Sequence, residues 1–370
     1  MKHELLWRPI GIAACACLTV GTGLSASAGR TADPAPAPNP EITEYRGLCD
    51  ASAAAWTNDS LFIAANDEDN TLLVFRLGEQ DPIRSIPLDD FLRPDAKTKN
   101  KEADIEAAAA VDDLVFWITS HGRDKDGDWR LNRHRFFALR IDPSHPDRTA
   151  PTGSAYDRLV FDLLEDPGLS GLGLQEAASP AVPRKKSLAP KKKGLNIEGL
   201  CRIPGTRSLW IGFRNPAPAG KALLVPFLNP EEVVLKGSAC RFGKPVLLDL
   251  GGLSIRDMTT VERTGAIWII AGCTDGSPDF RLFTWSGRPG DAPARAVTGL
   301  EWMATESFTP EAMLAGPGGR GALLLSDDGE RLMTDPEGFD CPCKKLKRIT
   351  DRRFRAAWLS SFGTQSGKMP

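Results

Sequence analysis

A two-strand unit occurs five times along this chain and restricts the folds that the chain can adopt. In each copy an acidic residue introduces a short apolar run, a turn of Gly, Asp or Asn follows, and a second apolar run ends on a polar residue. The introducing acids are Asp50, Glu106, Glu198, Asp257 and Glu311. The centres of the returning runs are Ile63, Ile118, Ile211, Ile269 and Leu324, which lie 13, 12, 13, 12 and 13 residues after the acids. Two apolar runs around such a turn are typical of a β-hairpin.

Repetition of a hairpin at intervals of about 50 residues favours a β-propeller, in which each blade is a four-stranded sheet. The sequence therefore predicts an all-β fold with five four-stranded blades. A sixth blade, in an insertion or across the two ends of the chain, stays open. Residues 158–163 are predicted to form the fourth strand of the second blade. Residues 354–359 are predicted to pair with the N-terminal segment, which would close the ring and leave no free edge.

The two ends of the chain depart from the repeat. Residues 1–28 have the layout of a secretory signal peptide, with basic residues before an apolar segment and Ala26-Ser27-Ala28 at its end. Residues 29–41 form a Pro- and Ala-rich linker, residues 42–362 the predicted propeller domain, and residues 363–370 a C-terminal tail. We therefore expect export to the periplasm or the extracellular space. No membrane span is expected, because the apolar segment is shorter than about 20 residues.

Residues 165–193 are predicted to be an insertion between blades, because the strand pattern stops there. The insertion is rich in Pro, Gly and Ala and carries two basic runs, Arg184-Lys185-Lys186 and Lys191-Lys192-Lys193. These runs either form a solvated loop or attract an anionic partner. The whole chain has a net charge of -2 at pH 7, which provides no basic surface for nucleic acid. We expect a monomer without a nucleic-acid partner.

Export changes the interpretation of the cysteines, because an oxidising compartment favours disulfides. The chain has 8 cysteines, and Cys15 and Cys17 lie within the predicted signal peptide. A propeller brings its first and last blades together, so Cys49 is predicted to pair with Cys341 or Cys343. Cys201 and Cys240 are a second predicted pair, within one repeat. The alternative is that the cysteines are free and buried as small apolar residues.

A propeller would place the polar residues of the repeat at one end of its central axis. The first strand of each blade lines the central channel and the second runs antiparallel beside it, so the start of one and the end of the other share a face. The residues three positions beyond the strand-two centres include Asn66, His121, Arg214 and Asp327. We predict a rim in which these four side chains and Arg256 bind a ligand. The predicted metal ligands of the rim are the acids Asp50, Glu106, Glu198, Asp257 and Glu311.

Three interpretations of this rim stay open, because five carboxylates around one axis need compensation. In the first, the acids bond to backbone amides of the next blade or to Arg46, Arg214 and Arg256, and hold the blades together. In the second, two or three carboxylates with Asn66 hold a Ca²⁺ ion, which prefers oxygen ligands. In the third, the rim binds an organic ligand directly and Arg214 clamps its anionic group.

Several segments in the middle of the chain carry a resemblance to a known family. They are Asn196-Ile197-Glu198-Gly199-Leu200, Gly212-Phe213-Arg214-Asn215-Pro216, Ala222-Leu223-Leu224-Val225-Pro226, Leu248-Asp249-Leu250-Gly251-Gly252 and Ile255-Arg256. In these segments the chain resembles a bacterial exported family catalogued as domain of unknown function 3616. The resemblance implies a propeller-like fold and export, and it implies no established activity. The Ile-Glu-Gly-Leu element is also similar to elements of esterase-like phytase and lactonase propellers.

Two functional hypotheses of different classes follow. The first is a module that binds a small or anionic ligand at the rim, either through Ca²⁺ or without a cofactor. The second is a metal-assisted hydrolase of phosphoesters, esters or lactones, in which Glu106 and Glu198 hold the ion and His121 is the general base. The alternative for His121 is a hydrogen bond within its own turn. The sequence does not decide whether the protein is an enzyme.

Overall fold

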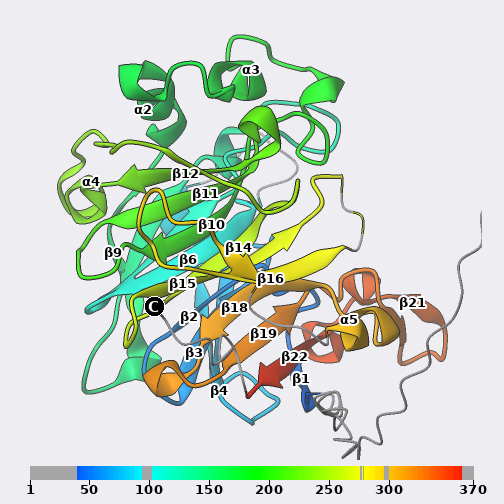
Figure 1. Ribbon diagram of the computed structural model, residues 1–370. Helices are drawn as coiled ribbons and strands as arrows, with labels where there is room; N and C mark the ends of the chain where they lie inside the picture. Colours follow the sequence, from blue (N-terminus) through cyan, green and yellow to red (C-terminus); the bar gives the residue numbers. More distant parts are fainter. Residues whose placement is uncertain (1–39, 94–101, 276, 278, 296–299, 361–370) are drawn as a thin grey trace, which may run out of the picture. The chain divides into compact units, whose positions relative to one another are not determined.

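A computed structural model describes residues 40–93, 102–275, 277, 279–295 and 300–360 (Figure 1). The predicted signal peptide, the predicted tail and most of the predicted linker lie outside the described residues. The chain divides after Ala37, and all described residues belong to the second unit, Pro38–Pro370. None of the helices in the described part of the chain has the length and apolar character that a membrane crossing requires.

Within the described residues, five antiparallel sheets of four strands each follow one another along the chain. The strands of the first two sheets are β2 (Ala53–Trp56), β3 (Leu61–Ala65), β4 (Thr71–Arg76), β5 (Arg84–Pro87), β6 (Ile105–Val111), β7 (Leu114–Thr119), β8 (Phe136–Arg140) and β9 (Ala150–Tyr156). Those of the next two are β10 (Asn196–Arg202), β11 (Leu209–Asn215), β12 (Ala222–Phe227), β13 (Val246–Leu248), β14 (Ser254–Val261), β15 (Ala266–Gly272), β16 (Phe280–Trp285) and β17 (Ala294–Arg295). The fifth sheet contains β1 (Ile42–Arg46), β22 (Arg353–Leu359), β19 (Ala322–Ser326) and β18 (Pro310–Ala315), and a separate hairpin contains β20 (Leu332–Thr334) and β21 (Asp340–Pro342).

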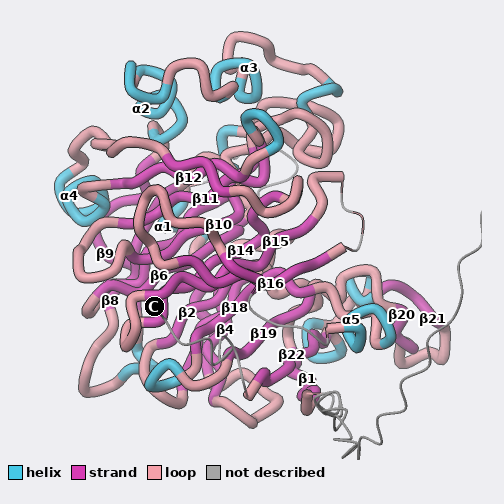
Figure 2. Tube along the Cα trace, viewed as in Figure 1, coloured by secondary structure: helices cyan, strands magenta, loops and turns pink. Residues whose placement is uncertain are grey.

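The helices are short and connect the strands (Figure 2). The α-helices are α1 (Asp89–Leu92), α2 (Leu159–Glu165), α3 (Leu174–Ala178), α4 (Pro230–Lys236) and α5 (Glu301–Thr305). The 3₁₀ turns are η1 (Leu131–Arg133), η2 (Pro146–Arg148), η3 (Pro167–Leu169), η4 (Lys186–Leu188), η5 (Pro218–Gly220), η6 (Pro317–Gly319), η7 (Cys343–Lys345) and η8 (Ile349–Asp351). Figure 2 shows α2 and α3 outside the sheets. The predicted insertion, residues 165–193, contains the turns η3 and η4 and the helix α3, and none of its described residues belongs to a strand.

The prediction of a strand at residues 158–163 is wrong, because these residues belong to α2. Leu159, Val160 and Leu163 are buried, and their spacing of one and four residues places them on one face of a helix. The fourth strand of the second sheet is β9, an edge strand without an apolar pattern. Gly153 in β9 has a φ of +68°, and a Cβ there would lie 2.1 Å from the Val234 carbonyl oxygen of α4. At Gly153 the backbone of β9 therefore approaches α4 too closely for a side chain.

The two ends of the described chain meet in the fifth sheet. β22 pairs with β1 from Ile42 opposite Ala357 to Arg46 opposite Arg353, as predicted, and it pairs with β19 on its other side. Next to this pairing, Cys49 and Cys343 form a disulfide with a Cα–Cα distance of 5.7 Å, which confirms one of the two predicted partners of Cys49. The first and last strands are thus joined by hydrogen bonds and by a covalent bond.

The predicted pairing of Cys201 with Cys240 is wrong, since both cysteines are free. Cys201 is buried on β10 in the core between the third and fourth sheets. Cys240 follows α4, and its backbone N–H donates to the carboxylate of Asp162 on α2 over 2.9 Å. The two thiols therefore belong to different surroundings.

Five hydrophobic cores lie between neighbouring sheets, and the last core lies between the fifth and the first. Each core contains at least one large buried side chain. Beginning with the core between the first and second sheets and ending with the core between the fifth and first, these are Trp117, Phe213, Trp285, Met313 and Tyr45. Each fully buried side chain of this size contributes roughly 1.5–3 kcal/mol. The first strands of the sheets are neighbours in the same circular order, β2, β6, β10, β14, β18 and again β2. Their starts therefore converge on a common region.

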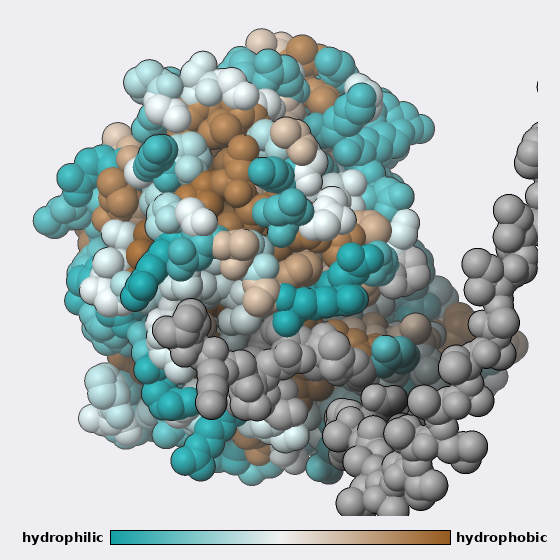
Figure 3. All heavy atoms as spheres, viewed as in Figure 1, coloured by the Kyte–Doolittle hydropathy of each residue, from teal (hydrophilic) through white to brown (hydrophobic). Residues whose placement is uncertain are grey.

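Apolar side chains also remain at the outer edge of the third sheet. In the view of Figure 3, hydrophobic side chains gather around the position of β11 and β12, and hydrophilic side chains surround them. Leu228, Leu235 and Leu247, which lie in or near α4, β12 and β13, are exposed. Single exposed apolar residues of this kind are common on protein surfaces.

Candidate functional site

The first strands of four sheets carry a register irregularity near their starts. One extra residue is inserted opposite the second strand, and this residue is Glu106 on β6, Glu198 on β10, Arg256 on β14 and Glu311 on β18. A β-bulge re-aims the side chain of the inserted residue. All four side chains line one cavity of about 330 Å³, named here the acidic cavity.

The acidic cavity has walls of three origins: the strand starts, the loops that follow second strands, and the insertion. Its carboxylates are Asp50, Asp67, Asp104, Glu106, Glu198, Glu311 and Asp327. Its cationic side chains are Lys125, Arg133, Lys191, Lys192, Arg214 and Arg256. Ala189, Pro190 and Asn196 complete the lining. Charges of both signs therefore face one enclosed space.

A buried ion network fills the side of the cavity next to the third and fourth sheets. Glu198 accepts a hydrogen bond from Arg214 over 2.9 Å, and its other oxygen lies 3.2 Å from Arg256 Nη1. Arg256 also pairs with Glu311. Nη2 and Nε of Arg214 donate to the Thr274 carbonyl oxygen over 2.9 and 3.2 Å. Arg214 and Arg256 are therefore already engaged by the protein.

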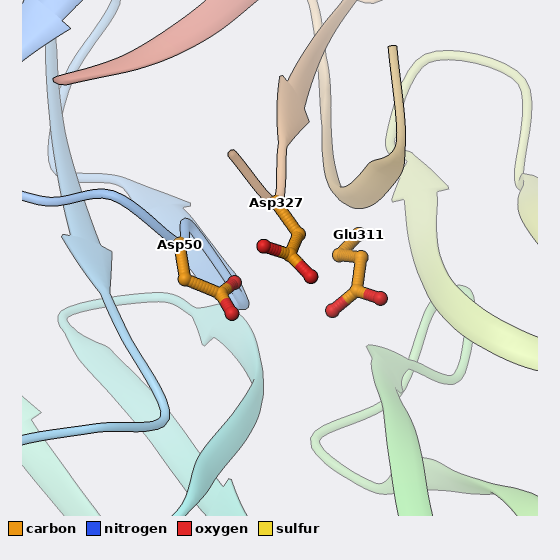
Figure 4. A group of neighbouring side chains, drawn as sticks. All are labelled: Asp50, Glu311 and Asp327. Carbon is orange, nitrogen blue, oxygen red and sulfur yellow. The ribbon is translucent and has the colours of Figure 1, made fainter. Parts of the chain in front are cut away.

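Three carboxylates on the opposite side point toward one another (Figure 4). One oxygen from each of Asp50, Glu311 and Asp327 lies within 4.8 Å of the other two. Asp50 precedes β2 and forms an isolated antiparallel bridge with Asp327, which follows β19. The group therefore joins the N-terminal part of the chain to the fifth sheet. It has the oxygen-only chemistry that suits a hard cation such as Ca²⁺.

Three cavity carboxylates without an arginine partner, Asp50, Asp67 and Glu106, have raised pKa values. Burial, followed by the charges of Asp104, Glu311 and Asp327, raises the pKa of Asp67 to about 8. Burial and the neighbouring acids also raise the pKa values of Asp50 and Glu106 well above the ordinary range. Among the described residues, Asp50 Oδ1 and Asp67 Oδ1 are buried without a hydrogen-bond partner. Asp67 therefore holds a proton near neutral pH unless a cation compensates its charge.

Three predicted site residues do not line the acidic cavity. Asp257 lies one residue beyond the bulge, and its carboxylate accepts a hydrogen bond from the Met313 amide of β18 over 2.6 Å. Asn66 accepts hydrogen bonds from the Glu68 and Asp69 amides over 2.8 and 2.7 Å and so closes its own turn. The third residue is His121.

His121 is fully buried in the turn after β7. Its Nδ1 lies 2.8 Å from the Thr119 carbonyl oxygen, and its ring packs edge-on against His134. Burial lowers the pKa of His121 to about 4, so the ring is neutral at pH 7. This is the alternative of a histidine hydrogen-bonded within its own turn. The remaining predicted residues, Asp50, Glu106, Glu198, Arg214, Arg256, Glu311 and Asp327, do line the cavity.

Two arginines outside the cavity have other partners, and one of them, Arg46, was predicted to pair with the rim acids. Arg46 pairs with Asp81 over 3.1 Å at the surface. Arg123 is buried and donates hydrogen bonds to backbone carbonyls of the insertion.

Seven polar lining residues were not predicted as site residues: Asp67, Asp104, Lys125, Arg133, Asn196, Lys191 and Lys192. Two of them had a visible signal, since Asp104-Ile105-Glu106 and Asn196-Ile197-Glu198 share a polar-Ile-Glu pattern. In the fourth repeat Ser254-Ile255 is followed by Arg256 in place of Glu, and the bulge there identifies Arg256 rather than Asp257 as the equivalent residue. Lys191 and Lys192 lie in a basic run for which an anionic partner was one alternative, but the order of residues along the chain does not tell that this run folds beside the cavity.

Comparison of the sequence with known protein families identifies one family that matches this chain. A family model described as "Protein of unknown function (DUF3616)" matches residues 50–134 and 170–304, which together exceed half of the chain. No curated protein matches the chain in sequence.

Several solved structures are similar in fold. Myxococcus xanthus glutaminyl cyclase has 11% identity and a TM-score of 0.42, with 86% of this chain and 94% of that chain covered. A GH43 β-1,3-galactosidase with galactodeoxynojirimycin has 11% identity, a TM-score of 0.43 and the same coverages. The exo-β-1,3-galactanase from Phanerochaete chrysosporium with galactose has 9% identity and a TM-score of 0.41, with 85% and 60% covered. Similarities of this degree carry no conclusion about the site.

Proposed function

The chain belongs to the family described as protein of unknown function, DUF3616, and we propose that its acidic cavity binds a divalent cation and, through it, a small anionic ligand. Asp50, Glu311 and Asp327 hold the cation, and Ca²⁺ is the ion that fits best. The convergence of these three carboxylates within 4.8 Å carries the proposal. Two oxygens that each lie about 2.3–2.6 Å from one Ca²⁺ ion can be separated by this distance.

The surroundings of Asp50 and Asp327 support a bound cation. Glu311 has Arg256 as a partner. Among the described residues, no arginine or lysine nitrogen lies within 4.0 Å of the Asp50 or Asp327 carboxylates. The buried Asp50 Oδ1 is also without a hydrogen-bond donor among the described residues. Burying such oxygens without compensation is costly, and a bound cation removes that cost.

Binding is favoured over hydrolysis because the predicted general base is badly placed. A general base must reach its proton within about 3 Å or through one water. His121 is buried outside the acidic cavity and is held by the Thr119 carbonyl group. The predicted ion ligand Glu198 is also engaged by two arginines.

We propose further that the five sheets are the blades of a five-bladed propeller. A second cavity, of about 260 Å³, is lined by the far ends of the same first strands, with Ala55, Ala109, Cys201, Thr260 and Ala315 among its residues. Two cavities at opposite ends of one set of five strands support a common axis. The disulfide supports export, since such bonds persist in oxidising compartments.

A thermal melt of the full chain, with EDTA and then with Ca²⁺, tests the cation site. A ligand that binds only the folded state raises the melting temperature by mass action. We expect a Ca²⁺-dependent rise for the wild type and none for Asp327→Asn. Asp59→Asn, at an exposed turn outside the cavity, should behave as the wild type. An equal rise in the Asp327→Asn protein would refute the site.

A further inference from the structure

We propose that Lys125, Lys191 and Lys192 form the part of the acidic cavity that takes a compact, multiply charged anion of the phosphate class. This inference rests on the proposed function, since the anion would bridge these lysines and the cation. The insertion is then part of the binding site and not merely a solvated loop.

The three lysines approach the cavity from two separate segments. Lys125 lies in the loop after β7, and Lys191 and Lys192 lie in the insertion just before β10. All three line the cavity and are exposed, so their ammonium groups stand at its mouth. In the described part of the chain, none of these ammonium groups has a carboxylate within 4.0 Å. Lysine is a compact point charge that suits phosphate, whereas each cavity arginine already pairs with a carboxylate of the protein.

The backbone that carries Lys191 and Lys192 is fixed rather than free. The Ala189 carbonyl oxygen accepts hydrogen bonds from the Lys192 and Gly194 amides over 2.9 and 3.3 Å. The side chain of Asn215, at the end of β11, donates to the Pro190 carbonyl oxygen over 2.9 Å. The lysines are therefore held beside the strand starts without an ion pair of their own.

A buried acceptor on the cavity wall gives an independent indication of a ligand. Asn196 is 2% exposed, and its Nδ2 donates to Glu198 over 2.6 Å, which fixes the orientation of the amide. Its Oδ1 is then a buried acceptor without a partner among the described residues. An acceptor in this place favours a ligand that carries a hydrogen-bond donor. Hydrogen phosphate carries an O–H donor, whereas sulfate does not, so the site should prefer phosphate.

Calorimetric titration of the full chain with inorganic phosphate, and separately with sulfate, tests this inference at pH 6.5 with and without Ca²⁺. We expect phosphate to bind more tightly than sulfate, because hydrogen phosphate can donate to Asn196 Oδ1. Phosphate should also bind more tightly with Ca²⁺ than without it, because the bound cation attracts the anion, and the reverse effect on Ca²⁺ should be equal. Lys191→Ala with Lys192→Ala should weaken phosphate binding at least tenfold while leaving the Ca²⁺-dependent melting shift in place. Asn196→Leu should remove the preference over sulfate.

The matched control is Lys185→Ala with Lys186→Ala, which removes two charges from the same insertion outside the acidic cavity. An equal loss of phosphate binding in both double variants would overturn the inference in favour of general charge attraction. Absence of phosphate binding despite a Ca²⁺ melting shift would overturn it as well, and the proposed function would stand. Lysine-dependent phosphate binding without any Ca²⁺ shift would instead contradict the proposed cation site alone.

Discussion

At the residue scale, Glu198 has a structural role in the cavity. Its side chain is buried and lies between Arg214 and Arg256, and Arg256 links it to Glu311. This corresponds to the first of the three interpretations of the rim, in which acids pair with arginines. Removing one member of a buried charge network leaves the others uncompensated, which costs more than the pairing itself contributes.

Glu198→Gln should therefore lower the free energy of unfolding by about 3 kcal/mol, because two buried guanidinium groups lose their shared counter-charge. Urea unfolding monitored by tryptophan fluorescence measures this difference. Glu232→Gln removes a solvent-exposed pair with Arg241 and should cost less than about 1 kcal/mol. Similar small losses in the two variants would contradict a structural role for Glu198.

The raised pKa of Asp67 makes a pH dependence of stability testable. The folded protein binds this proton with a pKa of about 8, whereas an unfolded Asp has a pKa of about 3.9. Between these values the folded state binds more protons than the unfolded state, so its free energy of unfolding falls as pH rises. The stabilisation that this proton gives the folded state is complete below about pH 4 and is lost as the pH rises through about 8.

The metal-free wild type should accordingly lose stability between pH 5 and pH 8 more steeply than Asp67→Asn, whose amide does not titrate. Urea unfolding in a chelator at several pH values measures both slopes. Parallel slopes in the two proteins would show that Asp67 is not the titrating group. Asp59→Asn controls for the loss of an aspartate in general.

At the scale of the elements, Arg123 holds the insertion beside the acidic cavity. Its guanidinium donates hydrogen bonds to the carbonyl oxygens of Ala178, Ser179, Val182 and Pro183, and to that of Gly127 in its own loop. Buried carbonyl groups of an irregular segment need such donors. Arg123 therefore ties the loop that carries Lys125 to the segment that carries the other two lysines.

Arg123→Met should release the insertion while the sheets stay folded. One hydrogen bond to a charged group contributes about 1.5–3 kcal/mol, so loss of several should speed tryptic cleavage after Lys185 or Lys186 at least tenfold. Mass spectrometry of timed digests locates the cleavage. Arg46→Met, which removes only an exposed pair with Asp81, should leave the rate unchanged. Unchanged cleavage in Arg123→Met would contradict the anchoring role.

The sequence was sufficient to predict the hairpins, four-stranded sheets and the pairing of the last strand with the first. It was insufficient to predict which neighbouring sheet the central residue of each second strand faces. Ile211, Ile269 and Leu324 face the preceding sheet, whereas Ile63 and Ile118 face the following one. Hairpin turns of different length change by one the number of residues between the introducing acid and the centre of the second strand. A one-residue shift turns a side chain to the other face of the sheet. The same shift led to Asp257 in place of Arg256.

Contributions from outside the repeat could not be predicted either. The lysines at the mouth of the cavity come from segments without strand periodicity, and their place depends on Arg123 and on the Asn215–Pro190 contact. Such contacts join residues far apart in sequence. A basic run alone is compatible with both a solvated loop and a binding site.

At the scale of the whole molecule, the candidate cation site lies at the junction of the two ends of the described chain. β1 pairs with β22 there, Cys49 is bonded to Cys343, and the adjacent Asp50 bridges to Asp327. The disulfide joins residues separated by 294 positions, so it closes almost the entire fold. Closure and cation binding are therefore expected to support each other.

Cys49→Ser should lower the free energy of unfolding by about 2–4 kcal/mol, because the bond restricts a very long loop in the unfolded chain. It should also weaken Ca²⁺ binding, since Asp50 follows Cys49 directly. Urea unfolding and calcium titration measure the two effects. Cys341→Ser removes a free cysteine of the same region and should change neither quantity much. Unaltered stability in Cys49→Ser would contradict the importance of this closure.

The most direct test of the cation site is a crystal structure of the full chain with Ca²⁺, using anomalous scattering to locate the ion. The account predicts one peak about 2.3–2.6 Å from oxygens of Asp50, Glu311 and Asp327. An acidic cavity without a peak, in crystals grown with Ca²⁺ in excess, would contradict the account and leave the carboxylates as protonated or internally paired groups.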